Sequence, residues 1–110
     1  MTYTFRGLTL PDELEASIRR YVDHGIPTGD FLQACIENDL SGACARADEQ
    51  NWPLIPVIVA YLRNECPAYC WGFNGAFQRW LEVKQKERES GRSFLPRVAD
   101  MYKRKANEQK

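Results

Sequence analysis

The sequence predicts an all-α protein, a single compact domain of five or six short helices. Apolar residues recur at helical spacing almost everywhere after residue 10. The breaks between these stretches hold Gly, Pro, Asn and Asp, which begin and end helices. A length of 110 residues with 44% hydrophobic content suits one domain with a substantial core. We therefore expect one domain over residues 1–110, with flexible tails at 1–9 and 103–110.

The first predicted helix lies in the stretch LPDELEASIRRYVDHG, with Pro11 at its first position and Gly25 as its stop. Its apolar face consists of Leu14, Ile18, Tyr21 and Val22. The only histidine, His24, falls in the last turn, where the helix dipole favours an imidazolium. We interpret it as a helix-end residue, because no serine or cysteine motif needs it as a base. Before this helix, TYTFRG is the only candidate for a strand.

Two short helices are expected next. Thr28 is the predicted cap of the first, whose buried residues are Phe31, Leu32, Cys35 and Ile36. The pair Asn38-Asp39 marks a break and a fresh helix start. The apolar stripe that follows consists of Leu40, Ala43, Cys44 and Ala47.

The most apolar segment is NWPLIPVIVAYLRNEC, which predicts a central helix because it is hydrophobic nearly all round. It should begin within a turn of Pro56 and end at Cys66-Pro67. A further helix is expected from Asn74, with Phe73, Phe77, Trp80 and Leu81 on one side. It should stop at Gly91, and a last short helix is expected within SFLPRVADMYKRKANEQK.

Charge divides the chain although the net charge is zero. Residues 1–70 carry ten acidic and five basic residues, a balance of −5. Residues 71–110 carry five acidic and ten basic residues, a balance of +5. This division favours attraction within or between chains, or simply a solvated C-terminal helix. No membrane span and no dedicated, sequence-specific DNA binding are expected, and the absence of a signal peptide predicts a cytosolic protein.

Few residues are candidates for catalysis or metal binding. Cys35, Cys44, Cys66 and Cys70 lack the two tight pairs of a zinc site, so we expect reduced, mostly buried thiols, no metal and no cofactor. The acidic residues near helix starts are interpreted as caps: Asp30, Asp39, Asp48 and Glu49. No catalytic residue is assigned, and the prediction is a non-enzyme. A paired-carboxylate hydrolase remains the minority alternative.

The segment NECPAYCWGFNGAFQRW concentrates aromatic residues, and helical spacing of Phe73, Phe77 and Trp80 favours core packing there. Tyr69 and Trp71 fall outside that spacing, in a turn between two arginines. Aromatic faces beside guanidinium groups suit a nucleobase and phosphate, or equally a protein partner. The candidate ligand-binding residues are Arg63, Tyr69, Trp71, Asn74 and Arg79.

The chain also resembles a widespread group of short, mostly uncharacterised phage and prophage proteins. The resemblance covers residues 24–81, with a GxFL…NDL…A…RAD segment followed by YLxNxxP…WG and a tryptophan-containing helix. The matching positions are Gly29, Phe31, Leu32, Asn38, Asp39, Leu40, Arg46, Ala47, Asp48, Tyr61, Leu62, Asn64, Pro67, Trp71, Gly72 and Trp80. It implies a viral accessory protein in the host cytoplasm that acts against host defence. It supplies no catalytic residues.

The leading hypothesis from sequence is a phage-encoded, non-enzymatic protein that sequesters a small anionic nucleotide signal. The first alternative is a stoichiometric inhibitor of a host defence protein, and the second is a small nucleotide or amide hydrolase. A homo-oligomer is expected, with Phe94 to Tyr102 packed on a neighbouring chain because that stretch is too apolar for a free tail.

Overall fold

The structure is a computed structural model and describes residues 2–90. Within that range the chain forms a hairpin, five α-helices and two one-turn 3₁₀ helices. Their bounds are β1 Thr4–Phe5, β2 Leu8–Thr9, α1 Asp12–His24, α2 Asp30–Ile36, α3 Leu40–Arg46, η1 Trp52–Leu54, α4 Ile55–Glu65, η2 Ala68–Cys70 and α5 Ala76–Ser90. The predicted all-α, single-domain fold is confirmed.

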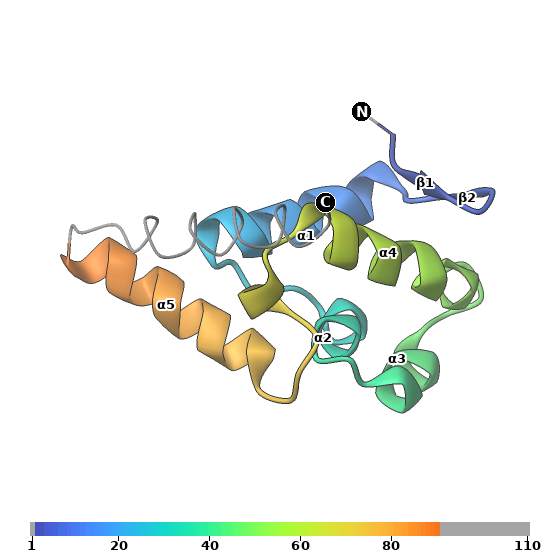
Figure 1. Cartoon of the computed structure of the whole chain (residues 1–110). Coiled ribbons are helices and arrows are strands. Elements are labelled where there is room, and N and C mark those ends of the chain that lie inside the picture. The colour runs from blue at the N-terminus through green and yellow to red at the C-terminus, as the bar shows by residue number, and fades with distance from the viewer. Residues whose placement is uncertain (1, 91–110) are drawn as a thin grey trace.

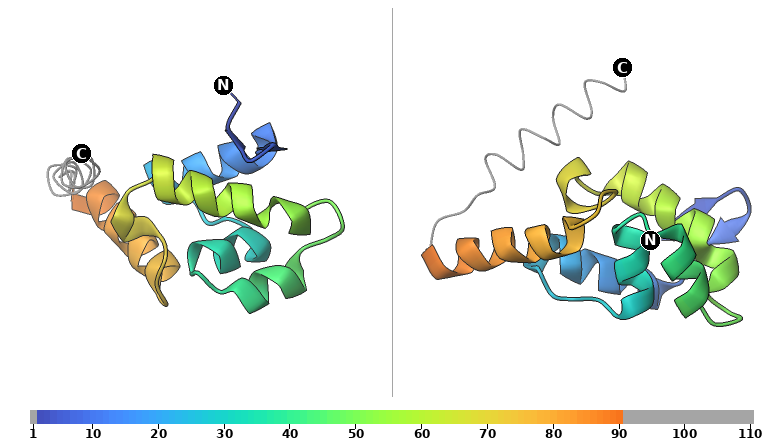
Figure 2. Two further views of the ribbon diagram at one scale, coloured as in Figure 1. Left: turned by 45° about the vertical axis from the view of Figure 1, so that its right-hand side comes forward. Right: turned by 90° about the horizontal axis from the view of Figure 1, so that it is seen from below.

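Helix α2 is the central element, because it contacts α3, α4 and α5. Figures 1 and 2 show α1 and α4 along one side of the molecule, α3 beside α2, and α5 extending away from the rest. Helix α4 is predicted as the central helix, but its main contacts are with α2, β1 and η1, and α2 holds the central place instead. Its apolar character does lead to burial, at Ile55, Val57, Ile58, Ala60, Tyr61 and Leu62. Among the described helices, none combines the length and apolar character needed to span a membrane.

One hydrophobic core joins these helices. Its fully buried side chains include Leu10, Ile18, Tyr21, Ile36, Val57, Ile58 and Leu62. They come from the segment before α1 and from α1, α2 and α4. Helices as short as α2 and α3 persist because packing against this core stabilises them more than local propensity does. Within residues 2–90, every buried side-chain nitrogen or oxygen has a hydrogen-bond partner.

The end of α1 is fixed by α5. Gly25 has a φ of 66° and its N–H donates to the carbonyl of Tyr21 at 3.0 Å, which ends the helix as predicted. The indole N–H of Trp80 donates to the carbonyls of Tyr21 and Val22, each at 3.1 Å. Nη1 of Arg88 donates to the carbonyl of His24 at 2.7 Å. Side chains of α5 thus bond to the last carbonyls of α1, to Val22 and His24 at the helix end and, as a second donor, to Tyr21.

The N-terminal segment forms a short hairpin whose first strand lies in TYTFRG, the one strand candidate in the sequence. Thr4 pairs with Thr9 and Phe5 with Leu8, across a turn in which Arg6 and Gly7 both have positive φ. The rings of Tyr3 and Tyr61 meet edge to face at 5.2 Å, and Nδ2 of Asn64 donates to the Tyr3 hydroxyl at 3.0 Å. The hairpin is held by aromatic contact with α4, which TYTFRG alone does not reveal.

Three helix starts also differ from prediction. Pro11 is the extended N-cap of α1 rather than its first helical residue. Helix α2 begins after Gly29, which lacks a side-chain cap bond, and the hydroxyl of Thr28 donates to the Gly29 carbonyl instead. Helix α5 begins at Ala76, so Asn74 lies outside it. The predicted stripe on α3 is half right: Ala43 is buried and Ala47 is partly buried against the core, but Leu40 is 65% exposed and Cys44 is exposed. Helix α3 meets α2 through the small residue Ala43 and through the ion pair of Arg46 with Asp30.

Several expectations lie outside the described residues. These are the stop at Gly91, the last short helix, the packing of Phe94 to Tyr102 on a neighbour and the tail at 103–110.

Candidate functional site

The aromatic turn between α4 and α5 is anchored at several points. The hydroxyl of Tyr21 donates to the carbonyl of Cys70 at 2.7 Å and is 3.5 Å from the carbonyl of Ala76. The N–H of Gly72 donates to the carbonyl of Ile36 at 2.7 Å. The middle of the turn is therefore attached to α1 and α2, and its α5 end to α1.

Anchoring divides the aromatic side chains of this region into two groups. Phe77 and Trp80 are buried, as core packing predicts, and Trp71 is half-buried against the core. Tyr69 is 48% exposed and Phe73 is 36% exposed. The predicted core role of Phe73 is therefore only partly fulfilled, because the turn points its ring partly into solvent.

The five predicted ligand residues are distributed over three helices and one turn. Arg63 is exposed in the last turn of α4, and Arg79 is exposed one turn into α5. Tyr69 belongs to η2, while Trp71 and Asn74 lie in the turn that follows it. Of these five, Asn74 lines the pocket described next, and the pocket lining includes none of the other four.

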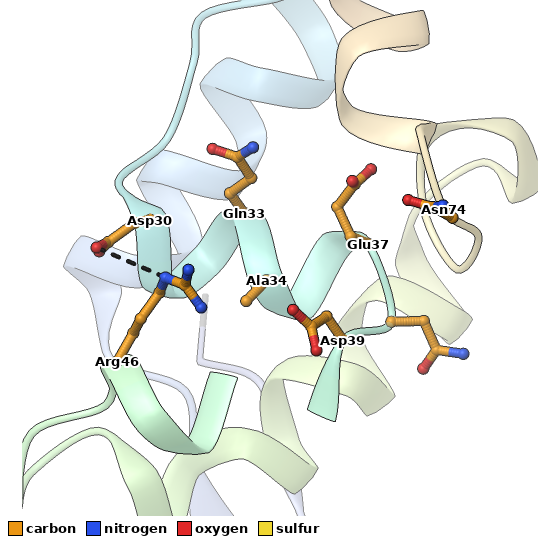
Figure 3. A pocket seen from close by; sticks show the side chains of 8 residues that line it. Asp30, Gln33, Ala34, Glu37, Asp39, Arg46 and Asn74 are labelled. Atoms are coloured by element: carbon orange, nitrogen blue, oxygen red, sulfur yellow. Dashed lines mark ion pairs between the residues drawn. The ribbon is translucent and has the colours of Figure 1, made fainter. Parts of the chain in front are cut away.

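The pocket has a volume of about 440 Å³ and lies beside α2. Its lining consists of Asp30, Gln33, Ala34, Glu37, Asn38, Asp39, Arg46 and Asn74. Figure 3 shows Asp30 and Arg46 at one end, Glu37 and Asn74 at the other, and Ala34 between them. The positions 30, 33, 34 and 37 follow helical spacing, so one face of α2 forms the floor.

Local structure fixes the rim of the pocket. Asn38 adopts a φ of 60°, which turns the chain sharply between α2 and α3. Oδ1 of Asp39 then accepts the N–H of Gly42 at 3.0 Å, so Asp39 caps α3 as predicted. Position 42 admits only glycine without rearrangement, because a Cβ there would meet the Asp39 carboxylate and the Arg46 guanidinium.

The electrostatic character of the pocket is acidic. Asp30, Glu37 and Asp39 supply three carboxylates, and Arg46 supplies the single cation of the lining. Nε of Arg46 lies 3.8 Å from Oδ2 of Asp30, and Nη1 of Arg46 donates to the Gly42 carbonyl at 3.2 Å. The positive charge of Arg46 therefore offsets the negative charge of Asp30 at one end of the pocket. An anion would meet a net negative lining.

Glu37 occupies a special position in this lining. Its Oε2 accepts the backbone N–H of Phe77 in the first turn of α5, at 2.8 Å. A carboxylate at a helix N-terminus satisfies an unpaired N–H and interacts favourably with the helix dipole. The cap of α5 therefore comes from the residue that ends α2, forty residues earlier in the chain.

Sequence reasoning missed this site because it interpreted each acidic residue separately. Asp39 does cap a helix, and Oδ1 of Asp48 accepts the N–H groups of Gln50 and Asn51. Asp30, in contrast, pairs with Arg46 across two helices. The available signal was the spacing of Asp30, Gln33 and Glu37, which marks a polar face opposite the buried face of α2.

The thiols divide between core and surface. Cys35, Cys66 and Cys70 are buried, and burial raises the pKa of Cys35 to about 12. Cys44 is exposed on α3, which corrects the expectation that it packs in the core. In residues 2–90 the structure brings together no group of three or more His, Cys, Asp or Glu side chains suited to a metal ion.

Comparisons with protein-family models, with curated proteins and with solved structures find no match to this chain.

Proposed function

We propose that this chain is a phage-encoded, non-enzymatic binding protein that blocks a host defence protein by direct contact in the host cytoplasm. The viral setting rests on the resemblance of residues 24–81 to phage proteins. The choice of a protein partner over an anionic nucleotide rests on one observation, the net negative lining of the pocket beside α2.

Exposed apolar side chains beside this pocket support a protein partner. Leu40 directly follows Asp39, and Phe73 directly precedes Asn74, so each neighbours a lining residue in the chain. Leu40 is 65% exposed and Phe73 is 36% exposed. Protein interfaces commonly combine apolar anchors with a polar recess that excludes or orders water. We call the surface formed by the pocket, Leu40 and Phe73 the α2 face.

A binding role is favoured over hydrolysis by the partners of the carboxylates. Asp39 accepts from Gly42, Glu37 accepts from Phe77, and Asp30 pairs with Arg46. Each carboxylate thus has a structural partner. A hydrolase needs carboxylates positioned for proton transfer to a substrate, and the hydrolase alternative gains no support from this arrangement.

The test is capture of a host protein from a bacterial lysate by the full chain and by two matched variants. Leu40→Glu places a charge on the α2 face at an exposed helix start, so folding should be little affected. Ile26→Glu makes the same kind of change at a residue that is 45% exposed and outside the pocket lining.

We expect one host protein to be retained in a fixed molar ratio by the unmodified chain and by Ile26→Glu, and to be lost with Leu40→Glu. Equal retention by both variants, or no retained protein, would contradict the proposal.

The nucleotide hypothesis remains a second candidate because Tyr69 exposes 48% of its surface on an anchored turn, where a base could stack. Titration calorimetry with a panel of cyclic and linear nucleotides tests it. Heat that disappears with Tyr69→Ala would favour the nucleotide over the protein partner.

A further inference from the structure

Glu37 belongs to two structures at once, the pocket lining and the start of α5. Its Oε2 is the acceptor of the Phe77 N–H, and Arg79 N and Ala76 N donate to the carbonyls of Gly75 and Phe73. Phe77 therefore depends on a distant side chain, whereas its neighbours bond within the same segment. Removal of the Glu37 carboxylate would leave this N–H without its acceptor.

The consequence would extend beyond one hydrogen bond. The ring of Phe77 stacks on Tyr21, with centroids 5.0 Å apart and planes 5° apart. The hydroxyl of Tyr21 holds the carbonyl of Cys70. The start of α5, the aromatic turn and α1 thus share one buried set of contacts, and a looser α5 start would also loosen the turn.

We propose that Glu37 couples occupancy of the pocket to the order of the first turn of α5. A cationic group that enters the pocket competes with the α5 N-terminus for the Glu37 carboxylate. A guanidinium carries a full charge and can bind a carboxylate with two hydrogen bonds, whereas the helix end offers about half a charge. This coupling rests on the proposed function, because it takes the α2 face as the binding surface.

The other charged groups around the pocket are less suited to this role. Asp39 is held by Gly42 within the α3 cap, and Asp30 already faces Arg46. Their partners lie on α3, which is joined directly to α2 in the chain. Glu37 is the lining carboxylate whose partner lies on α5, so it can transmit a change in the pocket to that helix.

A substitution can introduce a cation into the pocket, so the test does not require that the ligand be identified. Gln33→Arg introduces a guanidinium on the same face of α2, four residues before Glu37 and in reach of it. Gln33→Met is the matched neutral control. The readout is amide hydrogen exchange at Phe77, resolved by NMR, with residues in the middle of α4 as an internal reference.

We expect Glu37→Ala to accelerate exchange at Phe77 about fivefold, as loss of a helix cap implies. Gln33→Arg should also accelerate exchange at Phe77, whereas Gln33→Met should leave exchange at the rate of the unmodified chain. Glu37→Gln keeps an acceptor oxygen, so its exchange rate at Phe77 should lie between those of the unmodified chain and Glu37→Ala. This variant preserves the test if the alanine variant folds poorly. In the double variant, Gln33→Arg should add nothing to Glu37→Ala.

Two results would overturn the coupling. Unchanged exchange at Phe77 in Glu37→Ala would show that the carboxylate does not protect α5. Unchanged exchange in Gln33→Arg, with faster exchange in Glu37→Ala, would show that a cation in the pocket leaves the cap intact. Neither result depends on host-protein capture, so failure of the coupling and failure of the proposed function are distinguishable.

Discussion

Backbone groups at helix ends receive different kinds of hydrogen-bond partners in two regions of the molecule. These regions are the junction of α1 with α5 and the corner between α2 and α3. In both places a helix ends or begins with backbone groups that need partners. At the α1–α5 junction the partners are buried or long side chains of another helix, Trp80 and Arg88. At the α2–α3 corner the cap is the neighbouring Asp39, in contact with solvent.

This difference shows that the junction is tightly packed, whereas the corner exposes polar groups to solvent. Lys84 is 7% exposed, with its ammonium 5.3 Å from the Trp80 ring and 3.2 Å from Glu87, so even a cation is packed into the junction. At the corner, the exposed amide side chains of Gln33 and Asn38 line the pocket, together with Asn74 from the turn before α5. Side chains fill the junction, whereas the corner exposes polar groups around a pocket.

Gly25→Ala should break the junction most severely. Gly25 has a φ of 66°, and an added Cβ would collide with the side chain of Lys84. Strain and overpacking together should lower the free energy of unfolding by about 2–4 kcal/mol. Urea denaturation measures this. Gly75→Ala is the control, because its φ is 89° but its Cβ would meet open space, so only the strain should remain.

Trp80→Phe should weaken the junction without emptying it. The ring stays apolar, but the N–H that serves the carbonyls of Tyr21 and Val22 is lost. Leaving buried carbonyls less well satisfied should cost about 1–3 kcal/mol in the free energy of unfolding. An unchanged unfolding midpoint, with the same dependence on urea concentration, would mean that these bonds add no net stability.

The two cysteines of the corner sharpen the contrast between its inner and outer surfaces. Cys35→Ala should cost about 1 kcal/mol in packing, and the exposed Cys44→Ala much less. Iodoacetamide at pH 8 should modify Cys44 in the folded protein and spare Cys35, whose burial raises its pKa to about 12. Mass spectrometry of peptides reads the result, and rapid modification of Cys35 would place that thiol at the surface.

Asp30→Asn should have the smallest effect. The Asp30–Arg46 pair is 3.8 Å long and its two side chains are 80% and 47% exposed. Exposed pairs of this kind contribute about 0.5 kcal/mol or less, and added salt should remove even that. A thermal unfolding series in low and high salt checks it. A loss above 1 kcal/mol would mean that Arg46 organises the corner more than its exposure suggests.

Prediction from sequence succeeded for features that depend on neighbours in the chain. The periodicity of α1, the stop at Gly25, the apolar α4 and its end at Cys66-Pro67 were all predicted correctly. Each follows from local sterics, from hydrogen bonding of the backbone or from the spacing of apolar residues, and these are properties of consecutive residues. The cap at Asp39 belongs with them, because donor and acceptor are three residues apart.

The features that join distant segments could not be predicted from sequence, because they depend on how the helices pack. Glu37 meets Phe77, Trp80 meets the end of α1, and Asn74 joins Asp30 and Arg46 around one pocket. Candidate ligand residues were predicted in the aromatic turn because the local composition is unusual there. Asp30 was predicted to cap a helix because a helix starts nearby. Burial and pairing depend on which faces the packed helices turn toward each other. The amino-acid order therefore determined the helices and their apolar faces, whereas three-dimensional packing decided which polar groups share a cavity.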